Sequence, residues 1–225
     1  MGRDFHKYFG PWAERNAVDL GGVKVLAEFC NHSHLLYHED GTYSNVNSQG
    51  NREDEEDFGQ YMETIGYLKT RAEEIEIHSS AGDVKGLYMA QNHDEVFWDK
   101  LGAIKKRDGF KMIWEIEGPS ARKKHLNKVQ YALQYVDIFS INLQESRRLS
   151  GLEKEEDILD FLKALPVPMV LFRVGARGLY TLFEGRAYFH PSVLDFGVVD
   201  PTGCGNTSTG AAIYAYCEHG ADPIM

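Results

Sequence analysis

The strongest constraint on the fold is the regular alternation of short apolar runs and amphipathic segments after residue 58. The apolar runs are bounded by turn residues and predict buried strands at 86–91, 111–118, 137–142 and 168–175. The amphipathic segments predict helices at 95–109, 123–136 and 153–165, the last of which stops before Pro166. Strands and helices that alternate at this spacing predict βαβ units, and hence an α/β fold with a mostly parallel sheet flanked by helices.

Outside this alternation the chain has local patterns of its own. Aromatic residues at i, i+3, i+4 and i+7 predict a helix over 5–16. The stretches 23–30 and 34–47 are predicted as strands, and the turn at 39–41 makes the second a hairpin. Two further elements complete the prediction: a hairpin at 178–191 and a helix at 207–218.

The composition excludes several classes of partner. The 225-residue chain has a net charge of −10 and a pI near 5.4, which argues against a nucleic-acid or anionic-membrane surface. No apolar stretch approaches the ~18 residues of a membrane helix, and residues 1–10 lack the apolar core of a signal peptide. Cys30, Cys204 and Cys217 have no metal-type spacing and are interpreted as reduced thiols. We therefore expect a cytoplasmic protein.

The segment 198–210 combines a β-branched run that ends at Asp200, a turn with Gly203 and Gly205, and a helical stretch. A glycine turn at a helix start presents free N–H groups at the positive end of the helix dipole, which predicts an anion site. The alternative is a tight β–α turn with Asn206 as a helix N-cap. A dinucleotide-binding Gly-x-Gly-x-x-Gly motif is excluded, because Gly210 has the wrong spacing.

Two further motifs lie at predicted strand ends. Asn142 closes one strand and Glu145 follows at a helix start, so an amide and a carboxylate lie at the carboxyl edge of the sheet, where α/β proteins bind ligands. Such a carboxylate can hold Mg²⁺ through water. The alternative is a helix-start glutamate favoured by the dipole. Gly175 and Gly178 bracket a turn and by themselves indicate only that.

Taken in order, these three motifs resemble those of the ribokinase-like (PfkB-type) family of sugar and nucleoside kinases. The match consists of Asn142 with Glu145, then Gly175 with Gly178, then "DPTGCGNTSTG" at 200–210, where the family usually reads Asp-Thr-x-Gly-Ala-Gly-Asp. The resemblance implies a ribokinase-like α/β domain, formed here by 1–22 and 48–225, with 23–47 contributing to a small β-sheet lid. It also implies that two chains pair through the lid.

The resemblance implies transfer of a phosphoryl group from ATP to a hydroxyl of a sugar or nucleoside-like substrate, with Mg²⁺. Gly203, Cys204 and Gly205 would form the anion hole for the developing charge. Asp200 would lie on the substrate side, and Glu145 would organise Mg²⁺ through water. The residues implied on the nucleotide side are Asn142, Glu145, Arg173, Gly175, Gly178 and Thr202.

The sequence departs from the family pattern in ways that bear on activity. Asn206 occupies the position of the family's catalytic aspartate, and an amide cannot accept a proton from a substrate hydroxyl. Arg173 stands where the family more often has a small polar residue. The family's opening strands and closing helices have no counterpart in the chain. We therefore expect a kinase with weak activity, or alternatively a catalytically silent nucleotide- or sugar-binding module or a truncated gene product.

Overall fold

The structure is a computed structural model that describes residues 1–25, 28, 34–38, 43–46, 84–193 and 200–223. The chain divides into two compact units, Met1–His78 and Ser79–Met225, which are described separately. Among the helices within these ranges, none is long and apolar enough to cross a membrane.

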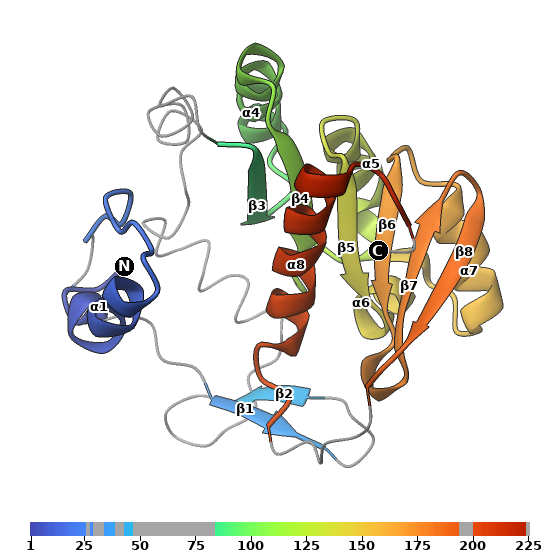
Figure 1. The fold of residues 1–225 in the computed structure, drawn as a ribbon. Coiled ribbons are helices and arrows are strands. Elements are labelled where there is room, and N and C mark those ends of the chain that lie inside the picture. Colours follow the sequence, from blue (N-terminus) through green and yellow to red (C-terminus); the bar gives the residue numbers. More distant parts are fainter. Residues whose placement is uncertain (26–27, 29–33, 39–42, 47–83, 194–199, 224–225) are drawn as a thin grey trace. The chain divides into compact units, whose positions relative to one another are not determined.

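The second unit is built on a six-stranded sheet with the strand order β3-β4-β5-β6-β7-β8 (Figure 1). The strands β3 to β6 are parallel, and β7 and β8 are added as antiparallel strands at one edge. The strands are β3 (Gly86–Gln91), β4 (Lys111–Ile116), β5 (Ile138–Asn142), β6 (Met169–Arg173), β7 (Gly178–Phe183) and β8 (Arg186–Pro191). The predicted α/β class and mostly parallel sheet are therefore confirmed.

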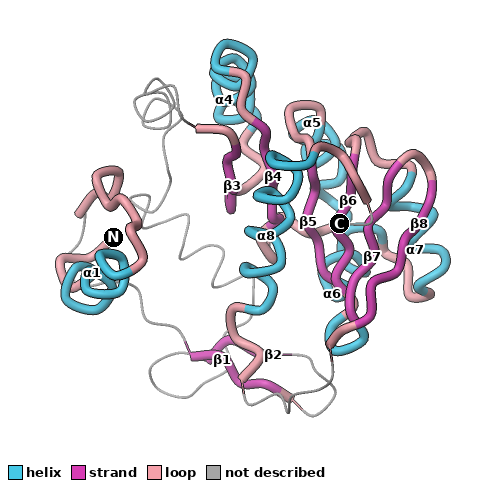
Figure 2. Tube along the Cα trace, viewed as in Figure 1, coloured by secondary structure: helices cyan, strands magenta, loops and turns pink. Residues whose placement is uncertain are grey.

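Helices follow the parallel strands and cover both faces of the sheet (Figure 2). They are α4 (Glu95–Asp108), α5 (Leu126–Leu133), α6 (Leu143–Ser150), α7 (Glu155–Lys163) and α8 (Cys204–His219), with short 3₁₀ turns at Lys123–His125 and Gly175–Arg177. Helix α8 lies across one face, in contact with β3 and β4, while α5, α6 and α7 lie behind the sheet (Figure 1).

The face away from α8 holds an aromatic core. Trp98 of α4 packs on Trp114 of β4 with ring centroids 4.7 Å apart, and Trp114 packs on Phe139 of β5 at 5.4 Å. All three side chains are fully buried. Because each buried aromatic ring removes a large apolar area from water, this cluster contributes several kcal/mol and fixes the central strands.

The sheet face beneath α8 is apolar along the first part of the strands and polar near their carboxyl ends. Ile113, Ile138 and Leu171 pack with Ile213 of α8 in one buried cluster. Because side chains alternate along a strand, the residues two positions further along each strand share this face. These residues are Glu115, Ser140 and Arg173. The strand pattern therefore places polar groups under the start of α8.

The predicted boundaries hold with two differences. The segment 123–136 divides into a 3₁₀ turn and the shorter α5. Helix α8 begins at Cys204, three residues before the predicted start, because Gly203 adopts a left-handed φ of 85° and its carbonyl accepts from the Thr207 N–H at 2.8 Å. Gly205 and Asn206 are therefore within the helix and not in a turn before it.

The first unit contains helix α1 (Phe5–Arg15) and the antiparallel pair β1 (His34–Tyr37) and β2 (Tyr43–Val46). The predicted helix and hairpin are confirmed, and the hairpin's turn lies outside the described residues. The predicted strand at 23–30 is wrong over 23–25, where the Val23 N–H donates to the Leu20 carbonyl in a turn. Its remaining residues, except Glu28, lie outside the described ranges.

Candidate active site

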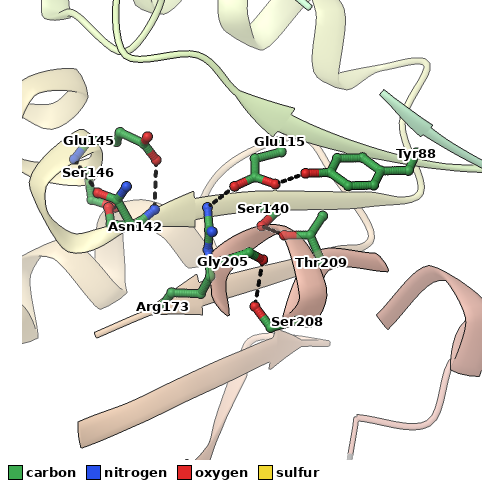
Figure 3. Close-up of polar contacts among 10 residues, drawn as sticks. All are labelled: Tyr88, Glu115, Ser140, Asn142, Glu145, Ser146, Arg173, Gly205, Ser208 and Thr209. Carbon is green, nitrogen blue, oxygen red and sulfur yellow. Dashed lines mark hydrogen bonds and ion pairs between the residues drawn. The ribbon is translucent and has the colours of Figure 1, made fainter. Parts of the chain in front are cut away.

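The junction of β5 and α6 is fixed by a reciprocal pair of hydrogen bonds. The Glu145 N–H donates to the Asn142 side chain at 2.9 Å, and the Asn142 N–H donates to Glu145 Oε2 at 2.9 Å. This capping box satisfies two N–H groups that a helix start leaves free. The alternative of a helix-start glutamate is therefore confirmed for Glu145, and the side chains of Asn142 and Glu145 are held at the carboxyl edge of the sheet (Figure 3).

Glu145 is buried, with 7% of its surface exposed. Burial raises the pKa of its carboxyl from the ordinary 4.5 to about 7, although the Asn142 N–H and the charge of Arg173 work in the opposite direction. A carboxylate that is this costly to ionise favours the approach of a cation or a proton.

A second polar cluster crosses from β3 to β6 under α8 (Figure 3). The Tyr88 hydroxyl donates a short hydrogen bond to Glu115 Oε2, and Glu115 Oε1 lies 2.7 Å from Arg173 Nη2. Each side chain of the ion pair is 13% exposed. Burial, followed by the bond to Glu115, raises the pKa of Tyr88, so the phenol remains a donor at neutral pH.

The start of α8 is open to solvent. Gly203 is the N-cap and supplies no side-chain hydrogen bond, so the predicted alternative of Asn206 as N-cap is wrong. In a helix the N–H groups of the second and third residues, here Gly205 and Asn206, have no carbonyl partner within the helix. Asn206 is exposed and Gly205 is half-buried, so these amides lie near the surface at the start of the helix.

Arg173 lies against this open helix start. A Cβ added at Gly205 would overlap Nη1 of Arg173, so glycine is required for the guanidinium to fit there. Deeper along the helix, Ser140 of β5 and Thr209 of α8 share a buried hydrogen bond of 2.9 Å that holds the first turns of α8 on the sheet. The structure thus brings together Arg173 and Gly205, which the sequence predicted as site residues.

Asp200 and Thr202 form a small turn before α8. Asp200 Oδ1 accepts from the Thr202 N–H at 2.8 Å, and the hydrogen bonds from the Thr202 side chain and backbone lower the pKa of the Asp200 carboxyl. Both residues are exposed. Asp200 is therefore ionised and directed to its own turn.

The turn between β6 and β7 has a packing requirement at Gly178. Its φ is 125°, and a Cβ there would overlap the backbone oxygen of His190 on β8. The turn is also tied to α7, since Arg177 forms an ion pair with Glu155 and the Tyr180 hydroxyl donates to Glu155 at 3.0 Å. Both features hold the turn in one conformation.

Four residues of this region were not predicted from the sequence: Tyr88, Glu115, Ser140 and Thr209. The one available signal was Glu115, a carboxylate in the apolar run 111–118. A charged residue in a buried strand needs a partner, and its position three residues before the strand's predicted end indicated the same edge of the sheet.

The donor set was compared with the cofactors that the resemblance implies. The start of α8, where no side chain caps the N–H groups, and the Arg173 guanidinium suit phosphate oxygens. Within the described ranges no group of three or more His, Cys, Asp or Glu side chains could hold a metal ion. Mg²⁺ keeps much of its water shell, so a single buried carboxylate, Glu145, fits a cation that is held through water and phosphate oxygens.

Comparisons with known proteins show the family and the fold that this chain resembles. A family model described as "pfkB family carbohydrate kinase" matches residues 16–223. A 2-dehydro-3-deoxygluconokinase from Thermoproteus tenax is 25% identical over 147 residues, which cover 65% of this chain and 38% of that protein. This chain therefore spans well under half the length of that curated relative.

Solved structures of kinases share the fold. A protein named provisionally as ribokinase II of E. coli, in its apo form, superimposes with a TM-score of 0.68 at 19% identity, covering 97% of this chain and 69% of that one. A nucleoside kinase from Burkholderia thailandensis in complex with inosine gives 0.63 at 16% identity, with coverages of 99% and 66%. Aminoimidazole riboside kinase from Salmonella enterica, with aminoimidazole riboside and an ATP analog, gives 0.61 at 11% identity, with coverages of 96% and 68%. The predicted resemblance and the ribokinase-like fold are confirmed.

Proposed function

Because the chain belongs to the pfkB family of carbohydrate kinases, we propose that it binds ATP with Mg²⁺ and transfers the γ-phosphoryl group to a hydroxyl of a sugar or sugar-like substrate. The observation that carries this proposal is the uncapped start of α8, with Gly205 packed against the guanidinium of Arg173. Both are positive, and they lie side by side.

Phosphoryl transfer depends mainly on positioning and on charge stabilisation. The N–H groups of Gly205 and Asn206, at the positive end of a 16-residue helix, would bind the oxygens on which charge develops. Gly203 and Cys204 shape this anion hole, since the left-handed Gly203 turns the chain into the helix. Arg173 adds a full charge beside it.

The remaining residues are assigned to the two substrates. The turn with Gly175 and Gly178, together with Thr202, would contact the nucleotide, and Asp200 would contact the phosphoryl acceptor. When bound, Mg²⁺ would offset charge on the phosphate oxygens. Asn142 holds Glu145 at the sheet edge, where its carboxylate can accept hydrogen bonds from the water shell of the cation.

Asn206 sets the expected rate. Its amide can hydrogen-bond and orient an acceptor hydroxyl but cannot remove the proton, and loss of general-base help costs about 10²–10⁴-fold. We therefore propose slow turnover with intact nucleotide binding. Asn206 also motivates a second candidate, a catalytically silent nucleotide- or sugar-binding module.

The first experiment is titration calorimetry of the protein with MgATP and MgADP. Binding of both is expected, and absence of any Mg-nucleotide binding would refute the kinase and leave only a sugar-binding module.

The second experiment separates the two candidates by turnover. Wild type and Asn206→Asp are assayed with ATP against 2-dehydro-3-deoxygluconate, ribose, inosine and related alcohols. A rise in kcat of about 10² or more in the variant supports the kinase. A variant that binds nucleotide but phosphorylates nothing supports the silent module.

We also propose a cytoplasmic homodimer that pairs through the hairpin of β1 and β2, acting as a lid. The support is the acidic composition and the family's lid arrangement. Sedimentation with and without substitutions in β2 tests the pairing, and a monomer at all concentrations would exclude it.

A further inference from the structure

The ion pair of Arg173 and Glu115 is buried but incompletely bonded. Nη2 of Arg173 lies 2.7 Å from Glu115 Oε1, yet neither Nη2 nor Nε makes a well-aligned hydrogen bond with any residue in the described part of the chain. A salt bridge that served stability alone would be expected to satisfy its buried donors. This guanidinium retains donor capacity.

The place where the guanidinium is held is electrostatically unfavourable in the absence of an anion. Arg173 is packed against Gly205, in the first turn of α8, so its charge lies at the positive end of the helix dipole. Without a negatively charged partner, the Arg173 side chain would be repelled from this position. The ion pair with Glu115 supplies that partner.

Glu115 is itself held in a fixed orientation. Its Oε2 accepts the short hydrogen bond from the Tyr88 hydroxyl, which leaves Oε1 directed at Arg173 (Figure 3). The strand between β4 and β6 is β5, and the residue in register with Glu115 on β5 is Ser140, whose small side chain is bonded to Thr209. The ion pair thus spans β5 within a rigid frame.

We infer that Glu115 and Tyr88 are positioning residues that hold the Arg173 guanidinium beside the first turn of α8, where it donates hydrogen bonds to the oxygens of the phosphoryl group during its transfer to the acceptor hydroxyl. This inference rests on the proposed kinase function. Glu115 acts through Arg173 and does not contact the substrate. Tyr88 acts one step further away, because its hydrogen bond to Oε2 of Glu115 leaves Oε1 to pair with Arg173.

The test compares Glu115→Gln with Arg173→Lys and with the double variant. Glu115→Gln keeps the shape and the acceptor for Tyr88 but removes the charge that holds Arg173. We expect kcat to fall about tenfold or more while KM for ATP changes less than about threefold, since the lost interaction is made in the transition state. The double variant should have the kcat of Arg173→Lys within about twofold, because Glu115 acts only through Arg173.

The matched control is Glu153→Gln, a substitution of an exposed glutamate whose side chain is 85% accessible and lies 3.5 Å from Arg147. It should leave kcat and KM unchanged. Tyr88→Phe should give an effect between those of the control and Glu115→Gln. Additive losses in the double variant, or an unchanged kcat in Glu115→Gln, would overturn the inference.

A second readout does not require turnover. The ¹⁵N–¹H signal of Arg173 Nε, identified by its loss in Arg173→Lys, is followed by NMR as MgADP or inorganic phosphate is added. We expect a resolved signal that shifts with either anion in wild type and in Glu153→Gln, and a broadened signal in Glu115→Gln. If no alcohol is phosphorylated but the signal shifts, the kinase proposal fails and the positioning of Arg173 stands. A signal whose chemical shift changes with neither anion, or that is unaffected by Glu115→Gln, refutes the positioning role.

Discussion

Substitution of Glu145 by glutamine should stabilise the protein at alkaline pH and weaken its function. Glu145 is the third residue of α6, and its carboxylate accepts from the Asn142 N–H while buried. Glutamine can serve the same capping box, since its side-chain oxygen accepts the same hydrogen bond. Glutamine also resembles the protonated acid in shape and in being neutral, so Glu145→Gln isolates the cost of the charge.

The magnitude follows from the pKa of Glu145, which burial raises from the ordinary 4.5 to about 7. At about 1.4 kcal/mol per pH unit, this difference corresponds to about 3 kcal/mol of unfavourable free energy when the folded state is ionised. Below pH 4.5 the carboxyl is protonated in both the folded and the unfolded chain, and nothing is lost. Between pH 4.5 and about 7 only the unfolded chain gives up its proton, so stability falls, and above about pH 7 the loss is complete.

Urea denaturation of wild type and Glu145→Gln at pH 5 and pH 8, in buffer without metal ions or nucleotide, measures the effect. At pH 5 the two proteins should differ by less than about 1 kcal/mol, and at pH 8 the variant should be more stable by about 3 kcal/mol. Glu153→Gln, at an exposed site, should show no pH-dependent difference. A variant that is less stable at pH 8, or a difference that does not change with pH, would refute the reasoning.

The same variant should bind Mg-nucleotide more weakly, since the charge that is costly for stability is the one assigned to the hydrated cation. Calorimetry at pH 8 measures this affinity. An unchanged affinity would remove Glu145 from the cation's surroundings while leaving the stability argument intact.

Two further predictions concern the packing around the site. Thr209→Val should lower the free energy of unfolding, measured in urea, by about 1–3 kcal/mol, because it leaves the buried hydroxyl of Ser140 without its partner. Adding Ser140→Ala should recover part of that loss, and losses that simply add would contradict the pairing. Gly178→Ala should lower the melting temperature more than Gly175→Ala, since a Cβ at 178 overlaps the backbone of His190 whereas a Cβ at 175 meets nothing within 4 Å. Thermal melts that rank the two variants in the opposite order would refute this.

Much of the fold was predictable because its signals are local. The strands of the sheet are continuous apolar runs, and the helices between them carry caps that can be read directly, such as Gly109 after α4 and the capping box of Asn142 with Glu145. The start of α8 was mispredicted because Cys204, Gly205 and Asn206 have low helix propensity. Their helical conformation comes from Gly203, which can adopt a left-handed φ, and from packing of the later turns.

The polar cluster under α8 was not predictable because its contacts are distant in sequence. Tyr88, Glu115 and Arg173 come from β3, β4 and β6, and only the strand order and register bring them to one face. The pattern of the chain placed Arg173 at a strand end, but nothing near it in sequence showed that its partner is Glu115. Gly205 has a similar status, since glycine is required there by the contact with Arg173, which is distant in sequence.

The charges of this cluster bear directly on what Asn206 does to the site. An aspartate at position 206 would add a negative charge beside the phosphate oxygens, and Arg173 with the start of α8 would partly offset it. With asparagine there, the same positive groups face a neutral side chain, so on the proposed function the anion would be held more strongly in the ground state and no group would remove the hydroxyl proton. Tight nucleotide binding and slow transfer would then be two results of one substitution, since binding that is equally strong before and during transfer does not raise kcat.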